Sequence, residues 1–185
     1  MIGPLLNRLT GKNSDQDKPV DPAFHFLKNS ALLAEVDAPA IELLSSRVVH
    51  RRYSRHEMIF REDNPGVCMF VIEQGQVEIF AENEGGDPIP LALLEAGALF
   101  GEIAAAFGNK RTASARAYSN DTQLLTVSRF DLGEVNKRYP RDGLHIQKMI
   151  SQSVVDSLIV TTNQVRELQR QVNHLQQNLD LYERK

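Results

Sequence analysis

The residues best suited to chemistry lie in one short stretch, FGEIAAAFGNKRTASARA, which runs from Phe100 to Ala117. Its Ala-rich middle favours a short helix, whose first backbone amides lack partners inside the helix and attract anions. Gly101 lets a ligand approach this backbone closely, and Arg111 can supply a two-pronged contact to a phosphate. The carboxylate of Glu102 repels phosphate but accepts hydrogen bonds from sugar hydroxyls. Together these groups predict a site for a ribose phosphate.

The elements that must position this stretch are short strands. Between about residue 51 and residue 127, apolar segments rich in β-branched and aromatic residues alternate with Gly-, Pro- and Asn-bearing turns. Gly75 lies in such a turn and indicates a tight hairpin, because glycine adopts positive φ without strain. Many short strands at this spacing predict an all-β sandwich or roll. The expected strands contain residues 58–60, 68–72, 77–80, 91–94, 113–117 and 123–127.

Helical patterns flank the strands on both sides. Apolar residues at helical spacing run from Ala23 to about Ser46, and the chain after Ser128 is again helical with one break at Tyr139-Pro140. We therefore expect an α+β protein: an antiparallel, jelly-roll-like β-roll with N-terminal helices and a long C-terminal dimerisation helix. The corresponding parts are an N-terminal segment (1–22), the β-roll (23–140) and the C-terminal helix (141–185).

Two rows of residues repeat every seven positions along the predicted C-terminal helix. Valine in one row and leucine in the other, in the central heptads, are typical of a parallel two-stranded coiled coil. The flanking positions carry uncharged amides, so selection of a partner by charge is weak, which suits a homodimer. The alternative is a helix that lies back on its own β-domain. The two rows are Leu158, Val165, Val172 and Leu179, and Thr161, Leu168, Leu175 and Tyr182.

The N-terminal segment carries a smaller signal. Ile2, Leu5, Leu6 and Leu9 form one amphipathic helical stripe, followed by a polar, Pro-bearing linker. One interpretation is an end that packs loosely on the body of the protein. The other is a docking helix, Met1–Thr10, for a protein partner.

Composition narrows the function classes. The chain has 185 residues, a net charge of −3 and one cysteine, which excludes an internal disulfide framework and favours a cytoplasmic home. It has no basic face of the kind that nucleic acids need and no apolar run that spans a membrane. The five histidines are scattered without metal-ligand spacing, so we expect no metal site.

The stretch FGEIAAAFGNKRTASARA resembles the phosphate-binding cassette of cyclic nucleotide-binding domains, and the resemblance extends over roughly residues 24–158. It implies that Glu102 holds the ribose 2′-hydroxyl and Arg111 the cyclic phosphate. Two positions depart from the family pattern: Lys110 replaces a common proline, and Glu57 replaces a common glycine. The other implied contacts are the backbone of Gly101, Ile103 and Ala104, the side chain of Thr112, and an apolar wall of Val71, Leu91 and Ala92.

The base is expected to meet the long helix. Counting from Arg111 along the family pattern brings Asp156, Ser157 and Thr161 to the base. An aspartate there suits guanine N–H groups, whereas serine or threonine suits adenine equally well. Of the two ligands, cAMP is favoured over cGMP.

The resemblance therefore implies a non-enzymatic, cyclic nucleotide-binding regulator. No helix-turn-helix segment follows the long helix, so we expect a stand-alone bacterial member whose output passes through another protein. We also expect Arg111→Ala to abolish binding while leaving the stability of the empty protein nearly unchanged. The alternative function is a nucleotide-independent dimeric scaffold on a degenerate form of the same fold.

Overall fold

The structure is a computed structural model that describes the backbone of residues 21–183 and the side chains of residues 21–178. The predicted docking helix, Met1–Thr10, lies outside the described residues, and so do the side chains of Leu179 and Tyr182.

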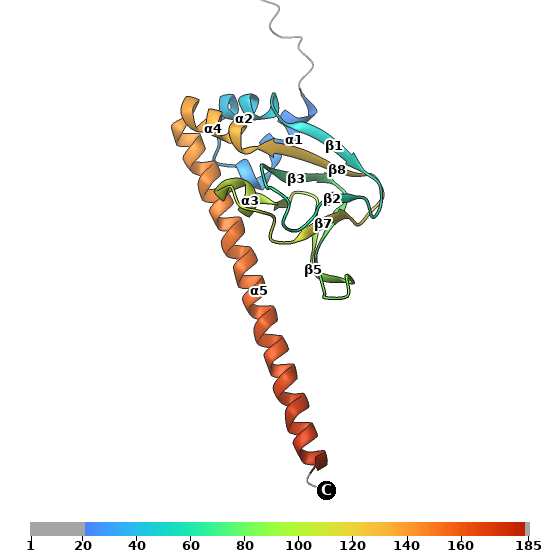
Figure 1. The fold of residues 1–185 in the computed structure, drawn as a ribbon. Coiled ribbons are helices and arrows are strands. Elements are labelled where there is room, and N and C mark those ends of the chain that lie inside the picture. Colours follow the sequence, from blue (N-terminus) through green and yellow to red (C-terminus); the bar gives the residue numbers. More distant parts are fainter. Residues whose placement is uncertain (1–20, 184–185) are drawn as a thin grey trace, which may run out of the picture.

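Within residues 21–183, eight strands form two antiparallel four-stranded sheets, which together make a roll (Figure 1). One sheet has the order β1-β8-β3-β6 and the other has the order β2-β7-β4-β5. The predicted antiparallel β-roll is thereby confirmed. The strands are β1 (Val49–Tyr53), β2 (Met58–Phe60), β3 (Cys68–Gln74), β4 (Gln76–Glu82), β5 (Pro88–Glu95), β6 (Leu99–Phe100), β7 (Ser114–Ala117) and β8 (Thr122–Ser128).

The predicted hairpin joins β3 to β4, and Gly75 at its tip has a φ of 86°. Strand β5 is longer than its apolar core at residues 91–94 indicates, because it begins at Pro88 and also contains Pro90. Proline cannot donate a backbone hydrogen bond, which excludes it from most strand interiors. Strand β5 lies at the edge of its sheet, next to β4 alone, so its prolines leave no partner strand unsatisfied.

The helices gather at one side of the roll. Asp21 caps the first helix by accepting a hydrogen bond from the Ala23 N–H, and Ser128 caps α4 by accepting one from the Asp131 N–H. The helical elements are α1 (Pro22–Asn29), η1 (Ala31–Leu33, a 3₁₀ turn), α2 (Ala38–Ser45), α3 (Glu102–Phe107), α4 (Arg129–Arg138) and α5 (Pro140–Glu183).

Two hydrophobic cores fix the roll and its helices. Successive residues of β3 point to opposite faces of the sheet. Phe70 and Ile72 therefore pack inside the roll, whereas Met69 and Val71 pack outward against α1, α2 and α5. The outer core attaches the first turns of α5 to the body of the protein, since Ile146 in that helix belongs to it.

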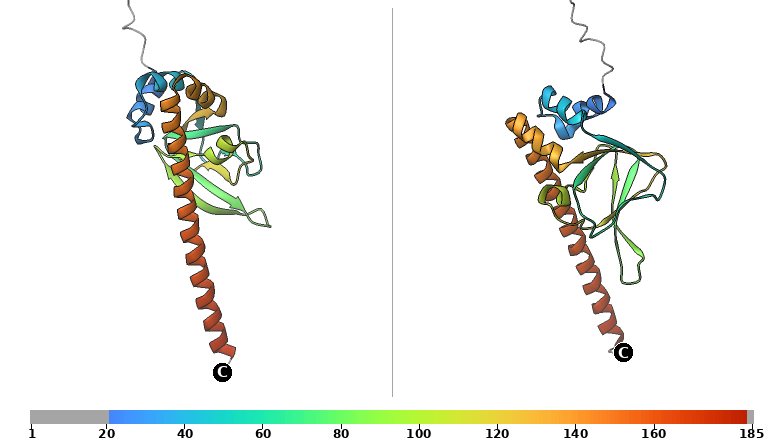
Figure 2. Two further views of the ribbon diagram at one scale, coloured as in Figure 1. Left: turned by 90° about the vertical axis from the view of Figure 1, so that its left-hand side faces the viewer. Right: turned by 45° about the horizontal axis from the view of Figure 1, so that its top comes forward.

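Helix α5 leaves the body of the protein and continues past the roll, as all three views agree (Figures 1 and 2). Its described heptad residues from Val165 onward are exposed and lie beyond the last contact of α5 with the cavity wall, at Gln164, so this distal stretch does not lie back on its own β-domain. None of the described helices combines the length and the apolar character required to cross a membrane. The exposed heptad residues are Leu158, Thr161, Val165, Leu168, Val172 and Leu175.

Candidate ligand-binding site

The cassette folds as its sequence predicts. Strand β6 leads into Gly101, whose left-handed backbone (φ 72°) caps the N-terminus of α3. Helix α3 stops at Gly108, which also has positive φ (69°). A side chain at Gly101 is excluded by space as well, because its Cβ would lie 2.5 Å from the Arg111 Nη1. The short helix is thus held between two glycines and against an arginine.

Arg111 is buried beneath the cassette, with 4% of its surface exposed. Its Nη1 donates to the Gly101 carbonyl oxygen at 2.7 Å, and its Nη2 donates to the Cys68 carbonyl oxygen at 2.8 Å. The guanidinium carbon lies 4.2 Å from the centre of the Phe60 ring, a cation–π contact. Nε is buried without a partner among the described residues, which leaves it as a donor for an anion.

Burial lowers the pKa of Arg111, opposed by Cys68 and by the carboxylate of Glu102. An arginine starts from so high a pKa that it stays charged at neutral pH. The strand that follows Arg111 agrees with the expected residues 113–117 to within one residue, because β7 begins at Ser114. Arg111 and Thr112 lie in the loop before it.

Glu102 opens α3 and is as buried as Arg111, with 4% of its surface exposed. Its Oε1 accepts a hydrogen bond from the Ser153 hydroxyl of α5 at 3.3 Å. Burial raises the pKa of this carboxyl, while bonds from its own backbone N–H and Ser153, and the charge of Arg111, oppose the rise. The result is a desolvated acceptor with a single side-chain donor among the described residues.

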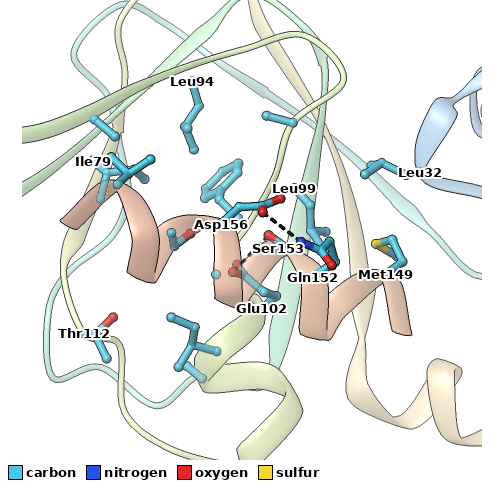
Figure 3. Close-up of a pocket in the computed structure, with 18 of the residues that line it drawn as sticks. Leu32, Ile79, Leu94, Leu99, Glu102, Thr112, Met149, Gln152, Ser153 and Asp156 are labelled. Carbon is cyan, nitrogen blue, oxygen red and sulfur yellow. Dashed lines mark hydrogen bonds between the residues drawn. The ribbon is translucent and has the colours of Figure 1, made fainter. Parts of the chain in front are cut away.

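A cavity of about 1000 Å³ lies between the cassette, the roll and α5 (Figure 3). This volume is at the upper end of the range for small-molecule sites. The two buried charged residues of the cassette, Glu102 and Arg111, line it. The structure also brings to its wall nearly all the predicted binding residues: Gly101, Ile103, Ala104, Thr112, Leu91, Ala92, Asp156, Ser157 and Thr161.

Val71 is the exception, and its expected place in the apolar wall is wrong. Val71 is absent from the cavity lining and belongs to the outer core, between the sheet and the helices. The alternation of side chains along β3 explains the error, because its neighbours Phe70 and Ile72 take the inward positions. The apolar wall comes instead from Phe60 of β2, Ile79 of β4 and Leu94 of β5.

Helix α5 contributes more of the wall than the sequence analysis assigned to it. A helical face extends in both directions from Asp156, and the spacing i, i+3, i+4, i+7 could have found it. The Gln152 side-chain amide donates to the Asp156 carboxylate at 2.9 Å, and Gln164 donates to the Leu91 carbonyl oxygen at 3.3 Å. The lining residues of α5 that we did not predict are His145, Lys148, Met149, Gln152, Ser153, Val160 and Gln164.

The described part of the chain contains no group of three His, Cys, Asp or Glu side chains arranged to hold a metal ion. Near the cassette, the buried charged groups of the cavity wall are the guanidinium of Arg111 and the carboxyl group of Glu102.

A β-roll that carries a glycine-bounded helix, a buried carboxylate and a buried arginine beside one cavity defines a class of ligand-binding regulatory domain. The sequence profile described as "Cyclic nucleotide-binding domain" matches residues 50–139 of this chain. This domain of the chain belongs to the cyclic nucleotide-binding domain family.

Individual relatives agree with this assignment. The chain is 32% identical over 114 residues to the cyclic AMP receptor protein of Thermus thermophilus, covering 62% of this chain and 52% of that protein. It is 28% identical over 135 residues to the human cyclic nucleotide-gated channel beta-1, covering 71% of this chain and 11% of the channel. The chain thus spans about half the length of the first relative and a small part of the second.

The fold has a solved counterpart in a cyclic nucleotide-binding domain from Methylobacillus flagellatus. That structure superimposes with a TM-score of 0.68 over 78% of this chain and 81% of its own, at 20% sequence identity. At this identity the likeness concerns the fold alone.

Proposed function

We propose that this chain is a receptor for a cyclic mononucleotide. The observation that carries the proposal is the pair Glu102 and Arg111, both buried and both at the wall of one cavity. Burying two charged side chains is costly unless their hydrogen-bonding groups are satisfied. Arg111 Nε has no partner among the described residues, and Glu102 has a single side-chain donor, so a ligand in the cavity that pairs with both would satisfy them. A cyclic nucleotide supplies a phosphate for one and a sugar hydroxyl for the other.

In this assignment the cyclic phosphate binds the Arg111 guanidinium, whose Nε has no partner among the described residues, and the backbone amides at Gly101, Ile103 and Ala104. The ribose 2′-hydroxyl donates to Glu102, and Thr112 lies beside the phosphate. The base extends from the sugar toward Leu91 and Ala92 on one side and α5 on the other, where Asp156, Ser157 and Thr161 provide polar contacts.

Between the two common ligands we favour cAMP over cGMP. The support is the relative with 32% identity, which is named for cyclic AMP, and the presence of Ser157 and Thr161, which suit adenine. Asp156 also suits the N–H groups of guanine, so the measurement below includes both nucleotides.

The output of the receptor is proposed to be structural and not catalytic. Helix α5 forms part of the cavity wall and then continues beyond the roll, so a nucleotide that prefers one position of α5 shifts the helix toward it. We infer a cytoplasmic homodimer that pairs through α5 and signals to a protein partner, with Met1–Thr10 as a candidate docking segment.

Titration calorimetry of the full chain with cAMP and with cGMP tests the proposal. We expect binding heat with cAMP and weaker binding of cGMP. No heat with either nucleotide up to millimolar concentrations would falsify the receptor function. Stronger binding of cGMP would reverse the assignment of the ligand and leave the receptor class in place.

A dimeric scaffold that works without nucleotide is the second candidate, and the exposed apolar row of α5 favours it, since that row can pair without a ligand. The scaffold hypothesis predicts a dimer that gives no binding heat with either nucleotide. The receptor predicts a dimer that binds at least one of them.

A further inference from the structure

The hydrogen bond between Ser153 and Glu102 joins the two halves of the cavity wall. Glu102 lies in the cassette and Ser153 lies on α5, 51 residues further along the chain. Figure 3 shows the pair inside the cavity, beside the Gln152–Asp156 pair. Among the described residues, this is the one side-chain hydrogen bond that links α5 to the cassette.

The carboxylate that holds α5 is also the group that the sugar hydroxyl needs. Glu102 is almost fully buried, and its carboxylate already accepts from its own backbone N–H and from Ser153. A hydroxyl that enters the cavity therefore meets a carboxylate whose acceptor toward α5 is occupied. The Ser153 hydroxyl occupies Oε1, the carboxylate oxygen that faces α5, so a sugar hydroxyl that approaches Glu102 at that oxygen competes with Ser153 for it.

We propose that Ser153 competes with the 2′-hydroxyl of the nucleotide for the Glu102 carboxylate. Ser153 is thus a positioning residue that ties α5 to the cassette in the ligand-free protein and is released when the sugar binds. This inference rests on the proposed receptor function and adds to it the contact through which the sugar reaches the helix.

The competition makes an affinity prediction with a definite sign. Ser153→Ala removes a hydrogen bond from the free protein but none from the complex with cAMP, so binding becomes tighter. A neutral or charge-assisted hydrogen bond of this kind corresponds to roughly a two- to tenfold decrease in Kd. Alanine is also a better helix former than serine, so α5 itself is retained.

Nucleotide chemistry supplies the second arm of the test. With 2′-deoxy-cAMP no hydroxyl displaces Ser153, so the bond exists both before and after binding. The Kd of Ser153→Ala for 2′-deoxy-cAMP should therefore equal that of the wild type. The gain should be confined to the ligand that carries the hydroxyl, which a general loosening of α5 would not produce.

Ser151→Ala is the matched control, because Ser151 lies on the same helix, is exposed, and bonds the Gln147 carbonyl oxygen within α5. We expect it to bind both nucleotides as the wild type does. Ser153→Thr keeps the hydroxyl and should restore the wild-type Kd for cAMP.

Calorimetry of the full chain and these three variants with cAMP and 2′-deoxy-cAMP decides the matter. A gain for Ser153→Ala with cAMP alone supports the inference. Equal changes with both ligands, no change, or weaker binding would overturn the inference while leaving the receptor function intact. If the wild type binds neither cAMP nor cGMP, the proposed function fails and the inference falls with it.

Discussion

Arg111 stabilises the protein even before any ligand arrives. Its Nη1 and Nη2 donate to the carbonyl oxygens of Gly101 and Cys68, and its guanidinium lies over the Phe60 ring. The sequence analysis expected Arg111→Ala to leave the stability of the empty protein nearly unchanged, but these contacts of Arg111 argue for a larger effect. Arg111, which we propose binds the phosphate, therefore also holds the cassette against β3.

We predict that Arg111→Ala lowers the free energy of unfolding of the nucleotide-free protein by about 2–4 kcal/mol, because the carbonyl oxygens of Gly101 and Cys68 each lose a hydrogen bond and the Phe60 ring loses its cation–π contact. Urea denaturation without nucleotide measures the change. Arg61→Ala is the control: its ion pair with Glu82 is exposed, and such pairs contribute about 0–1 kcal/mol. Equal effects of the two substitutions would contradict the structural role of Arg111.

Glu102 should leave a signature in the pH dependence of stability. Burial raises its pKa in the folded protein above the ordinary carboxyl value. The folded state therefore holds a proton that the unfolded chain has already released, and stability falls as the pH rises through the raised pKa. In the absence of nucleotide, Glu102→Gln should remove this fall and be more stable than the wild type at neutral pH.

Urea titrations of the wild type and Glu102→Gln between about pH 4.5 and 7.5 test this linkage. Glu84→Gln, in the exposed turn between β4 and β5, is the control and should follow the wild-type profile. Parallel profiles for the wild type and Glu102→Gln would exclude Glu102 as the source of the pH dependence.

At the scale of elements, α3 depends on the backbone of the residue before it. Gly101 has a φ of 72° and sits against the Arg111 guanidinium, so alanine there is strained and also displaces Arg111. We predict that Gly101→Ala lowers the free energy of unfolding by about 1–3 kcal/mol and weakens nucleotide binding. Thermal and urea denaturation, with calorimetry, measure the two effects.

Gly133 supplies the control for this substitution. It lies inside α4 with no heavy atom near the position of an added Cβ. Gly133→Ala should raise the free energy of unfolding by about 0.5–1 kcal/mol, because alanine is favoured inside helices. If Gly101→Ala and Gly133→Ala change the free energy of unfolding in the same direction, the left-handed backbone of Gly101 does not determine the effect of alanine at that position.

Local signals explain which elements the sequence predicted well. Gly101 and Gly108 around α3, and Gly75 in the hairpin, have positive φ, which few residue types other than glycine adopt. The ends of α3 and the β3–β4 turn could therefore be predicted from the sequence. The expected strand at residues 91–94 is shorter than β5 (Pro88–Glu95). Proline is disfavoured inside strands, and the sheet order is needed to see that β5 is an edge strand, where proline is tolerated.

The candidate site was predictable where its residues are close in sequence and less so where they are distant. The cassette residues from Gly101 to Thr112 all reach the cavity. Val71 did not, because an apolar strand residue can face either side, and only the packing of the helices decides which. Ser153 lies three residues before Asp156 on the same helical face, so helical spacing could have indicated it once Asp156 was assigned to the cavity.

At the scale of the whole molecule, the apolar heptad residues along α5 favour pairing with a second helix. The described ones are more than half exposed, from 51% for Val165 and Val172 to 66% for Leu175. We predict a dimer of twice the 20.8 kDa chain mass, and a monomer for the double substitution Leu168→Asp, Val172→Asp, which places charges in the seam.

Sedimentation equilibrium measures both masses. Asn173→Asp adds a charge to the same stretch of α5 but outside the heptad rows, and it should leave the dimer intact. A double variant that keeps the dimer mass would show that the subunits associate through another surface.

The unbroken length of α5 has a mechanical consequence. The helix meets the cavity wall as far as Gln164 and then continues for 19 further residues to Glu183, about 28 Å at 1.5 Å per residue. It acts as a lever arm: a tilt of about 10° at the cavity moves the far end by roughly 5 Å over that rise. The proposed release of Ser153 from Glu102 would therefore be amplified along α5 into a larger displacement at the end of the helix.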